Sequence, residues 1–104
     1  LDRAPVQFHL ISPTRKALGK SIPIHFDTGI MHGADVIAGL ASGGNFAWIG
    51  RAYLYGLMAG GRAGVEKTFN ILVSQMTRTM KLLGVNSVSE LEPSMVTTLF
   101  EMRP

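Results

Sequence analysis

The chain has 104 residues, no cysteine, 46% apolar and 16% charged residues, and a formal net charge of +3. This length allows one domain and excludes two of ordinary size. Without cysteine the chain can form neither a disulfide framework nor a zinc site with Cys ligands. Its basic residues are scattered, with no run longer than Arg15-Lys16, so we expect no nucleic-acid partner.

The sequence carries no sign of a membrane segment or a leader. Its longest uncharged stretch, residues 36–50, is shorter than the roughly 20 apolar residues of a membrane span. The opening Leu-Asp-Arg-Ala-Pro has no initiator Met and no basic-then-apolar signal pattern. We therefore expect no membrane span, a cytoplasmic protein, and a sequence that begins inside a longer chain.

The first part of the chain predicts a helical region followed by a strand. Ser12 before Pro13 is typical of an N-cap and a first helical turn, and Gly19 is typical of a helix end. Because Pro13 interrupts the apolar pattern, we expect two short helical pieces there. Alternating apolar residues over 22–26 predict a strand, and Asp27-Thr28-Gly29 ends it.

The middle of the chain predicts a helix and a second strand. Residues 33–42 have apolar side chains at helical spacing, with Asp35 in the first turn, where the helix dipole favours an anion. Gly43-Gly44 stops this helix. Residues 46–49 are a short apolar strand, and Gly50-Arg51 ends it.

The strongest helical pattern covers residues 62–83, where apolar residues recur at spacings of 4, 3, 4, 4 and 3 before Gly84. Ser87 and Glu90 have the spacing of a capping box for one more short helix. Strands alternating with helices at these distances predict βαβ units, hence an α/β fold with a parallel sheet. Two parallel strands cannot form a stable sheet alone, so we expect exposed apolar faces along both strands.

Similar loops follow the two predicted strands: Asp27-Thr28-Gly29 after the first and Gly50-Arg51 after the second. The carboxyl ends of parallel strands carry ligand-binding loops in both α/β sheets and barrels. Glycine lets the backbone approach a ligand, a helix start offers free N–H groups to an anion, and Arg adds a bidentate cation. The pair predicts a phosphate site. The alternative is that both glycines are ordinary turn residues and Arg51 is a solvated surface residue.

The same loops carry a family resemblance. From Ile22 to about Leu91 the sequence resembles the C-terminal part of the FMN-dependent 2-hydroxy-acid dehydrogenases and oxidases. The matching pieces are Asp27-Thr28-Gly29-Ile30, Gly33-Ala34-Asp35-Val36, Ile49-Gly50-Arg51, Tyr53-Leu54-Tyr55-Gly56, Gly64-Val65 and Arg78-Thr79-Met80-Lys81-Leu82-Leu83-Gly84-Val85. The resemblance implies a TIM (β/α)8 barrel. Residues 1–104 would be the C-terminal fragment of this single FMN-binding domain, from its helix 6 through strand 7, helix 7 and strand 8 to helix 8, and incomplete on its own.

The resemblance also implies FMN as cofactor and oxidation of a lactate-like 2-hydroxy acid to a 2-oxo acid, with hydride transfer to FMN. The implied phosphate-binding residues are Asp27, Thr28, Gly29, Ile30, Met31, Gly50 and Arg51. The family's catalytic histidine base and substrate-binding arginine precede a Leu-Asp that matches Leu1-Asp2. This chain therefore holds no catalytic residue and should be inactive alone. The implied partners are a small-molecule substrate, the N-terminal remainder of the barrel and further copies, since the family is commonly tetrameric.

Two positions depart from the family's usual pattern. Met31 stands where the family has an Arg that helps to neutralise the phosphate. His32 either substitutes for that Arg in part or is merely an exposed helix-start residue. Ala52 replaces a proline and adds an N–H donor at a helix start, which we expect to reach the phosphate.

These departures suggest a subgroup. Asp-Thr-Gly-Ile-Met and the run from Gly50 to Gly61 look closest to the subgroup that includes pre-mycofactocin synthase, an FMN oxidase that deaminates a peptide-derived intermediate. An enzyme of that kind is one alternative to a hydroxy-acid enzyme. A non-catalytic phosphate-binding α/β module is another.

The remaining candidate residues are predicted to be structural. His9, His25 and His32 lack metal-ligand spacing, so we expect no metal site. We interpret His25 as a hydrogen-bonded histidine within the barrel and Trp48 as a core residue.

Overall fold

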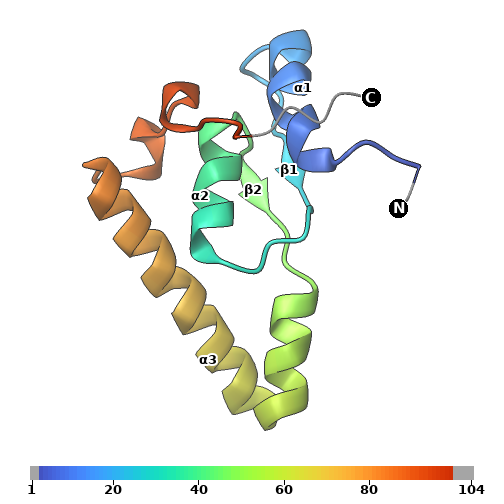
Figure 1. Cartoon of the computed structure of the whole chain (residues 1–104), viewed down its shortest axis with the longest axis vertical. Coiled ribbons are helices and arrows are strands. Elements are labelled where there is room, and N and C mark those ends of the chain that lie inside the picture. Colours follow the sequence, from blue (N-terminus) through green and yellow to red (C-terminus); the bar gives the residue numbers. More distant parts are fainter. Residues whose placement is uncertain (1–2, 100–104) are drawn as a thin grey trace.

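A β–α–β unit forms the centre of the fold. The computed structural model describes residues 3–99, which form, in chain order, η1 (Gln7–Leu10), α1 (Ile11–Leu18), β1 (His25–Phe26), α2 (Gly33–Ala41), β2 (Phe46–Ala47), α3 (Arg51–Leu83), η2 (Val88–Glu90) and η3 (Pro93–Met95), where η marks a 3-10 helix. β1 and β2 pair in parallel, with His25 opposite Phe46. α2 makes the crossover between them (Figure 1). The predicted parallel βαβ unit is confirmed.

α2 packs on one face of the strand pair, over the side chain of Phe26. Phe26 is 5% exposed and belongs to a core cluster that also contains Ile11, Ile30 and Val36. Gly39 in α2 and Gly44 after it lie so near the Phe26 ring that a Cβ on either would overlap it. These two glycines therefore let the helix and the following turn lie directly on the ring.

The opposite face of the strand pair carries an open aromatic cluster. The His25 ring stacks on Phe46, with ring centroids 5.0 Å apart, and Trp48 Nε1–H donates to His25 Nδ1 at 3.2 Å. Trp48 is 53% exposed and Phe46 is 51% exposed, because the described residues leave this face largely uncovered. The prediction that Trp48 is a core residue is therefore wrong within this chain. The hydrogen-bonded state expected for His25 is confirmed.

Both strands are shorter than predicted. β1 holds only His25–Phe26 and β2 only Phe46–Ala47, whereas the apolar patterns extend over 22–26 and 46–49. Within residues 3–99 each strand has a single neighbour, so only one edge of each forms a ladder.

The ends of the first helix differ in part from the prediction. α1 begins at Ile11, and Ser12 lies inside its first turn without capping it. The boundary between the two helical pieces falls at Leu10–Ile11 instead of Pro13, because a proline in the first turn of a helix breaks no hydrogen bond. Gly19 ends α1 with a φ of 73°, as predicted.

α3 begins at Arg51, eleven residues before the predicted start at Arg62. It consists of two arms, residues 51–59 and 62–83, separated by the non-helical Gly60-Gly61. Figure 1 shows the two arms folded against each other as a narrow V. The sequence analysis expected a helix start at Ala52, but the apolar periodicity does not extend over the first arm, because Gly56 interrupts it.

The two arms of α3 meet at a pair of glycines. A Cβ on Gly64 would overlap the carbonyl of Gly56, and a Cβ on Gly56 would overlap Thr68 Oγ1 and the Gly64 carbonyl. The Thr68 hydroxyl donates to the Gly64 carbonyl at 2.9 Å. This close backbone approach fixes the first arm, and with it the start of α3, on the second arm.

Arg15 ties α1 to the end of the βαβ unit that lies away from the loops after β1 and β2. Its guanidinium donates to the carbonyls of Gly43 at 2.9 Å, Gly19 at 2.7 Å and Ile22 at 2.8 Å, and also to Asn45 Oδ1.

Hydrogen bonds from a charged group contribute more than neutral ones, so Arg15→Met should lower the free energy of unfolding by about 2–4 kcal/mol. Urea unfolding checks this, with the exposed neighbour Lys16→Met as control. If Arg15→Met lowered the free energy of unfolding no more than Lys16→Met, the hydrogen bonds of Arg15 would not stabilise the fold.

Candidate functional site

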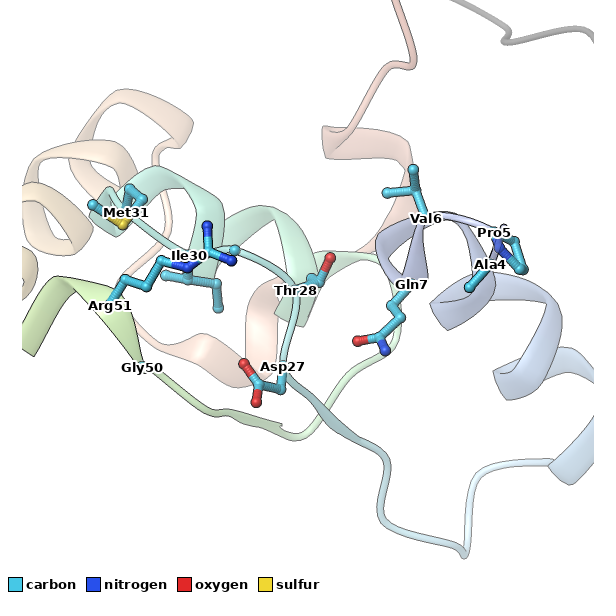
Figure 2. A pocket seen from close by; sticks show the side chains of 11 residues that line it. Ala4, Pro5, Val6, Gln7, Asp27, Thr28, Ile30, Met31, Gly50 and Arg51 are labelled. Atoms are coloured by element: carbon cyan, nitrogen blue, oxygen red, sulfur yellow. The ribbon is translucent and has the colours of Figure 1, made fainter. Parts of the chain in front are cut away.

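All seven predicted phosphate-binding residues line one hollow. Its volume is about 610 Å³, within the range of ligand-binding pockets. Residues 27–31, which follow β1, form one wall, and Gly50-Arg51 at the start of α3 form another. Residues 4–7 close a third side (Figure 2). The sequence analysis did not predict this last segment, because nothing in Ala-Pro-Val-Gln is specific to ligand binding.

The start of α3 offers free hydrogen-bond donors to this hollow. The first bond of the helix runs from the Leu54 N–H to the Gly50 carbonyl at 3.3 Å, so the three preceding N–H groups have no acceptor within the helix. Gly50, the N-cap residue, has no side chain, and no other side chain in the described part of the chain caps this end. Arg51 is exposed and pairs with no carboxylate among residues 3–99. The first arm of α3 thus presents free N–H groups, the positive end of its dipole and a cation together.

The start of α2, by contrast, is closed by its own side chains. The Asp35 carboxylate accepts from the N–H groups of Met31 at 3.1 Å and His32 at 2.9 Å. His32 Nδ1 accepts from the Ala34 N–H at 2.9 Å, which completes a capping box. The expectation of Asp35 in the first turn is confirmed. Its role is to cap the helix.

Gln75, on the second arm of α3, is hydrogen-bonded to the remaining N–H group at the start of α2. Its Oε1 accepts from the Gly33 N–H at 2.8 Å. The N–H groups of residues 31–34 are therefore all bonded within the protein, and none is left for an anion. Sequence reasoning missed Gln75 because it lies 42 residues from Gly33, and no local pattern connects them.

His32 has a defined role that decides between its two interpretations. Its Nδ1 accepts from the Ala34 N–H, and its side chain is exposed at the start of α2. Unlike Met31, it is not among the residues that line the hollow. The structure therefore favours the second interpretation, in which His32 is an exposed helix-start residue, and it makes this residue the N-cap of α2.

The backbone beside the hollow has room for a ligand. A Cβ on Gly29 or Gly50 would meet no atom within 4 Å, and Gly29 adopts a φ of +64°, which favours glycine. Open backbone, the free N–H groups at the start of α3 and the Arg51 guanidinium fit a phosphate group. Asp27 also lines the hollow, but its carboxylate only accepts hydrogen bonds and suits a hydroxyl better than a phosphate oxygen.

A family model described as FMN-dependent dehydrogenase matches residues 1–98. The chain belongs to this family. Among its relatives, a protein named "Putative L-lactate dehydrogenase" from Mycobacterium tuberculosis is 54% identical over 104 residues, which is all of this chain and 25% of that protein. The L-lactate oxidase of Lentilactobacillus hilgardii is 36% identical over 92 residues, 88% of this chain and 25% of that protein. This FMN-dependent dehydrogenase chain thus spans about a quarter of the length of these relatives.

Solved structures agree with the family assignment. The chain resembles (S)-mandelate dehydrogenase, described as a monotopic membrane protein, with a TM-score of 0.85 and 31% identity over 90% of this chain and 25% of that one. It resembles the flavin-binding domain of baker's yeast flavocytochrome b2 with a TM-score of 0.83 and 31% identity over 91% of this chain and 26% of that one. The chain is therefore a partial TIM-barrel-like α/β segment.

The subgroup expected from the sequence is not supported. The pre-mycofactocin synthase of Mycobacterium tuberculosis is 37% identical over 94 residues, 90% of this chain and 24% of that protein. The lactate dehydrogenase relative reaches 54% over the whole chain. The subgroup prediction depended on two short stretches of sequence, whereas these identities are taken over most or all of the chain.

Two further features bear on the type of protein. No helix formed by residues 3–99 is long and apolar enough to cross a membrane. Those residues also contain no group of three or more His, Asp or Glu side chains that could hold a metal ion.

Proposed function

We propose that this chain is the C-terminal, phosphate-binding part of an FMN-dependent enzyme that oxidises a 2-hydroxy acid to a 2-oxo acid. Residues 1–104 then belong to a single (β/α)8 domain whose other strands extend the β1–β2 pair. One observation supports this most strongly: the open start of α3, Arg51 and the glycine loop after β1 converge on one hollow. The family match adds FMN as the ligand.

Each wall of the hollow suits a different part of FMN. Gly50, Arg51 and the free N–H groups after them, including that of Ala52, suit the phosphate, because they combine donors with positive charge. Gly29 and Ile30 provide backbone without bulk on the opposite wall. Asp27 suits a hydroxyl of the ribityl chain. FMN supplies the hydride-accepting ring of the reaction, and this chain holds its phosphate end.

A lactate-like acid is the substrate class that the relatives favour. They include the M. tuberculosis lactate dehydrogenase relative at 54% identity and a 2-hydroxyacid oxidase of Dictyostelium discoideum at 34% over 96 residues. We place the catalytic histidine and the substrate-binding arginine in a preceding part of the protein. A cytoplasmic location and assembly into a homo-oligomer remain predictions.

The test is flavin content and turnover of the full-length protein. We expect it to carry FMN and to lose the visible absorbance of its oxidised flavin on anaerobic addition of L-lactate or a related 2-hydroxy acid. Residues 1–104 alone should not turn over. A full-length protein that is colourless and binds no FMN would instead support a non-catalytic phosphate-binding module.

Met31 gives a prediction of its own. It lines the hollow, is 50% exposed, and offers a phosphate no charge. Met31→Arg should lower the Kd for FMN by about tenfold, since a charged hydrogen bond contributes roughly 1.5–3 kcal/mol and ordering the side chain offsets part of it. Riboflavin, which lacks the phosphate, should bind unchanged. The control is Met58→Arg at an 80% exposed position on the first arm of α3. Equal gains in both variants would indicate general charge attraction only.

A further inference from the structure

The loop after β1 is attached to the second arm of α3 at Gly33. The Gly33 N–H donates to Gln75 Oε1 at 2.8 Å in a half-buried contact. A Cβ on Gly33 would overlap the Leu72 carbonyl and crowd the Met76 nitrogen, so the start of α2 lies directly on the backbone of this arm. Gly33 is itself buried. The wall formed by residues 27–31 therefore ends at a fixed point on α3.

The other wall is attached to the same arm by a different contact. Gly50-Arg51 begin the first arm of α3, and the Gly56–Gly64 approach holds that arm on the second. Both walls of the hollow thus take their positions from residues 62–83. Figure 1 shows this arm running alongside the first arm and α2.

Among the described residues, Gln75 is the only polar side chain of the second arm that is hydrogen-bonded to the start of α2, where the loop of residues 27–31 leads into the helix. We propose that Gln75 is a positioning residue for the phosphate site, holding the loop of residues 27–31 at the right separation from Arg51. The Gly33 N–H is bonded to Gln75 and is therefore not available to the phosphate. Gln75 acts on the site only by holding the loop in place. The proposal rests on the proposed function, because it concerns how the same hollow binds FMN.

The experiment compares FMN with riboflavin in the full-length apoprotein, by quenching of flavin fluorescence. Gln75→Leu keeps the side-chain volume but removes the acceptor, and Gln75→Glu keeps an acceptor oxygen in the same place. We expect the leucine variant to raise the Kd for FMN roughly three- to tenfold, the range of one lost hydrogen bond, with the Kd for riboflavin changed less than about twofold. The glutamate variant should keep the FMN-to-riboflavin ratio of the wild type. Ser74→Ala, at the exposed neighbouring position, is the control.

Each outcome decides the proposal. An unchanged ratio in Gln75→Leu overturns it, and so does an equal loss of FMN and riboflavin, which would be a general loss of structure. If the leucine variant does not fold, Gln75→Asn replaces it. This variant shortens the amide by one methylene, and a wild-type ratio there overturns the proposal. A wild-type apoprotein that binds FMN no better than riboflavin refutes the phosphate site itself, separately from the role of Gln75.

Discussion

Replacing Arg51 by methionine should raise the Kd of the full-length protein for FMN by about tenfold to a hundredfold. A hydrogen bond between charged groups contributes roughly 1.5–3 kcal/mol, and within residues 3–99 Arg51 is the only basic side chain that lines the hollow. Riboflavin should bind almost as before. Arg51→Lys should give an intermediate loss, because lysine keeps the charge but not the planar, bidentate group. Fluorescence titration of the apoprotein measures both ligands.

Arg62 provides the matched control for this experiment. It lies on the same helix and its side chain is 94% exposed. Among residues 3–99 it pairs only with Glu66, four residues later. Arg62→Met therefore changes the net charge by the same amount without touching the hollow. If both methionine variants weakened FMN binding equally, the effect of Arg51 would be long-range charge attraction. If neither did, the phosphate would have to bind elsewhere.

The two helix starts beside the hollow explain why we expect a large effect at Arg51. At α2, Asp35, His32 and Gln75 occupy the N–H groups that could otherwise bind an anion. At α3 no side chain among residues 3–99 caps the helix, and its first three N–H groups have no acceptor within the helix. A phosphate bound here would therefore depend on a single helix dipole and a single arginine. The Asp35 carboxylate, which accepts from the Met31 N–H, adds negative charge beside the other wall and makes anion binding there still less favourable.

The sequence was sufficient to predict which loops meet, but not how they are bonded. The carboxyl ends of parallel strands must share one edge of a sheet, so Asp27-Thr28-Gly29 and Gly50-Arg51 were predictable as neighbours. The hydrogen bonds that occupy the N–H groups at the start of α2 were not predictable in the same way. Histidine is an uncommon N-cap, and the Gln75 contact depends on how α3 packs on α2. Tertiary contacts between distant residues leave no periodic pattern in the sequence.

In the fold, too, features set by neighbouring residues were predictable, whereas features set by contacts between distant residues were not. Gly19, Gly43 and the Ser87–Glu90 capping box mark helix ends through local geometry, and the structure contains each of them. The start of the first arm of α3 was expected at Ala52, but its extent was not, because Gly56 interrupts the apolar pattern. That glycine is required by a contact with the second arm, not by the arm's own helical propensity. Trp48 was misjudged as a core residue because nothing among the described residues covers the face of the strand pair on which it lies.

Gly64→Ala tests the contact between Gly56 and Gly64 in α3, because the contact decides whether the substitution raises or lowers the free energy of unfolding. Helix propensity alone would raise the free energy of unfolding by about 0.5–1 kcal/mol when alanine replaces a helical glycine. The new Cβ, however, would overlap the Gly56 carbonyl, which cannot rotate away as a side chain could. We therefore expect a net loss of about 2 kcal/mol, within the range of overpacked cores, measured by urea unfolding of the full-length protein.

Ala63→Gly, at the exposed neighbouring position, measures the effect of helix propensity alone. It should lower the free energy of unfolding by about 0.5–1 kcal/mol. A stabilising Gly64→Ala, mirroring the loss in Ala63→Gly, would show that the two arms do not touch at this point. The predicted loss has a second consequence, because the same contact positions the start of α3. Pushing the first arm away moves Arg51 from the loop after β1, so Gly64→Ala should also weaken FMN binding more than riboflavin binding. Ala63→Gly changes the helix without moving the arm and should leave that preference intact.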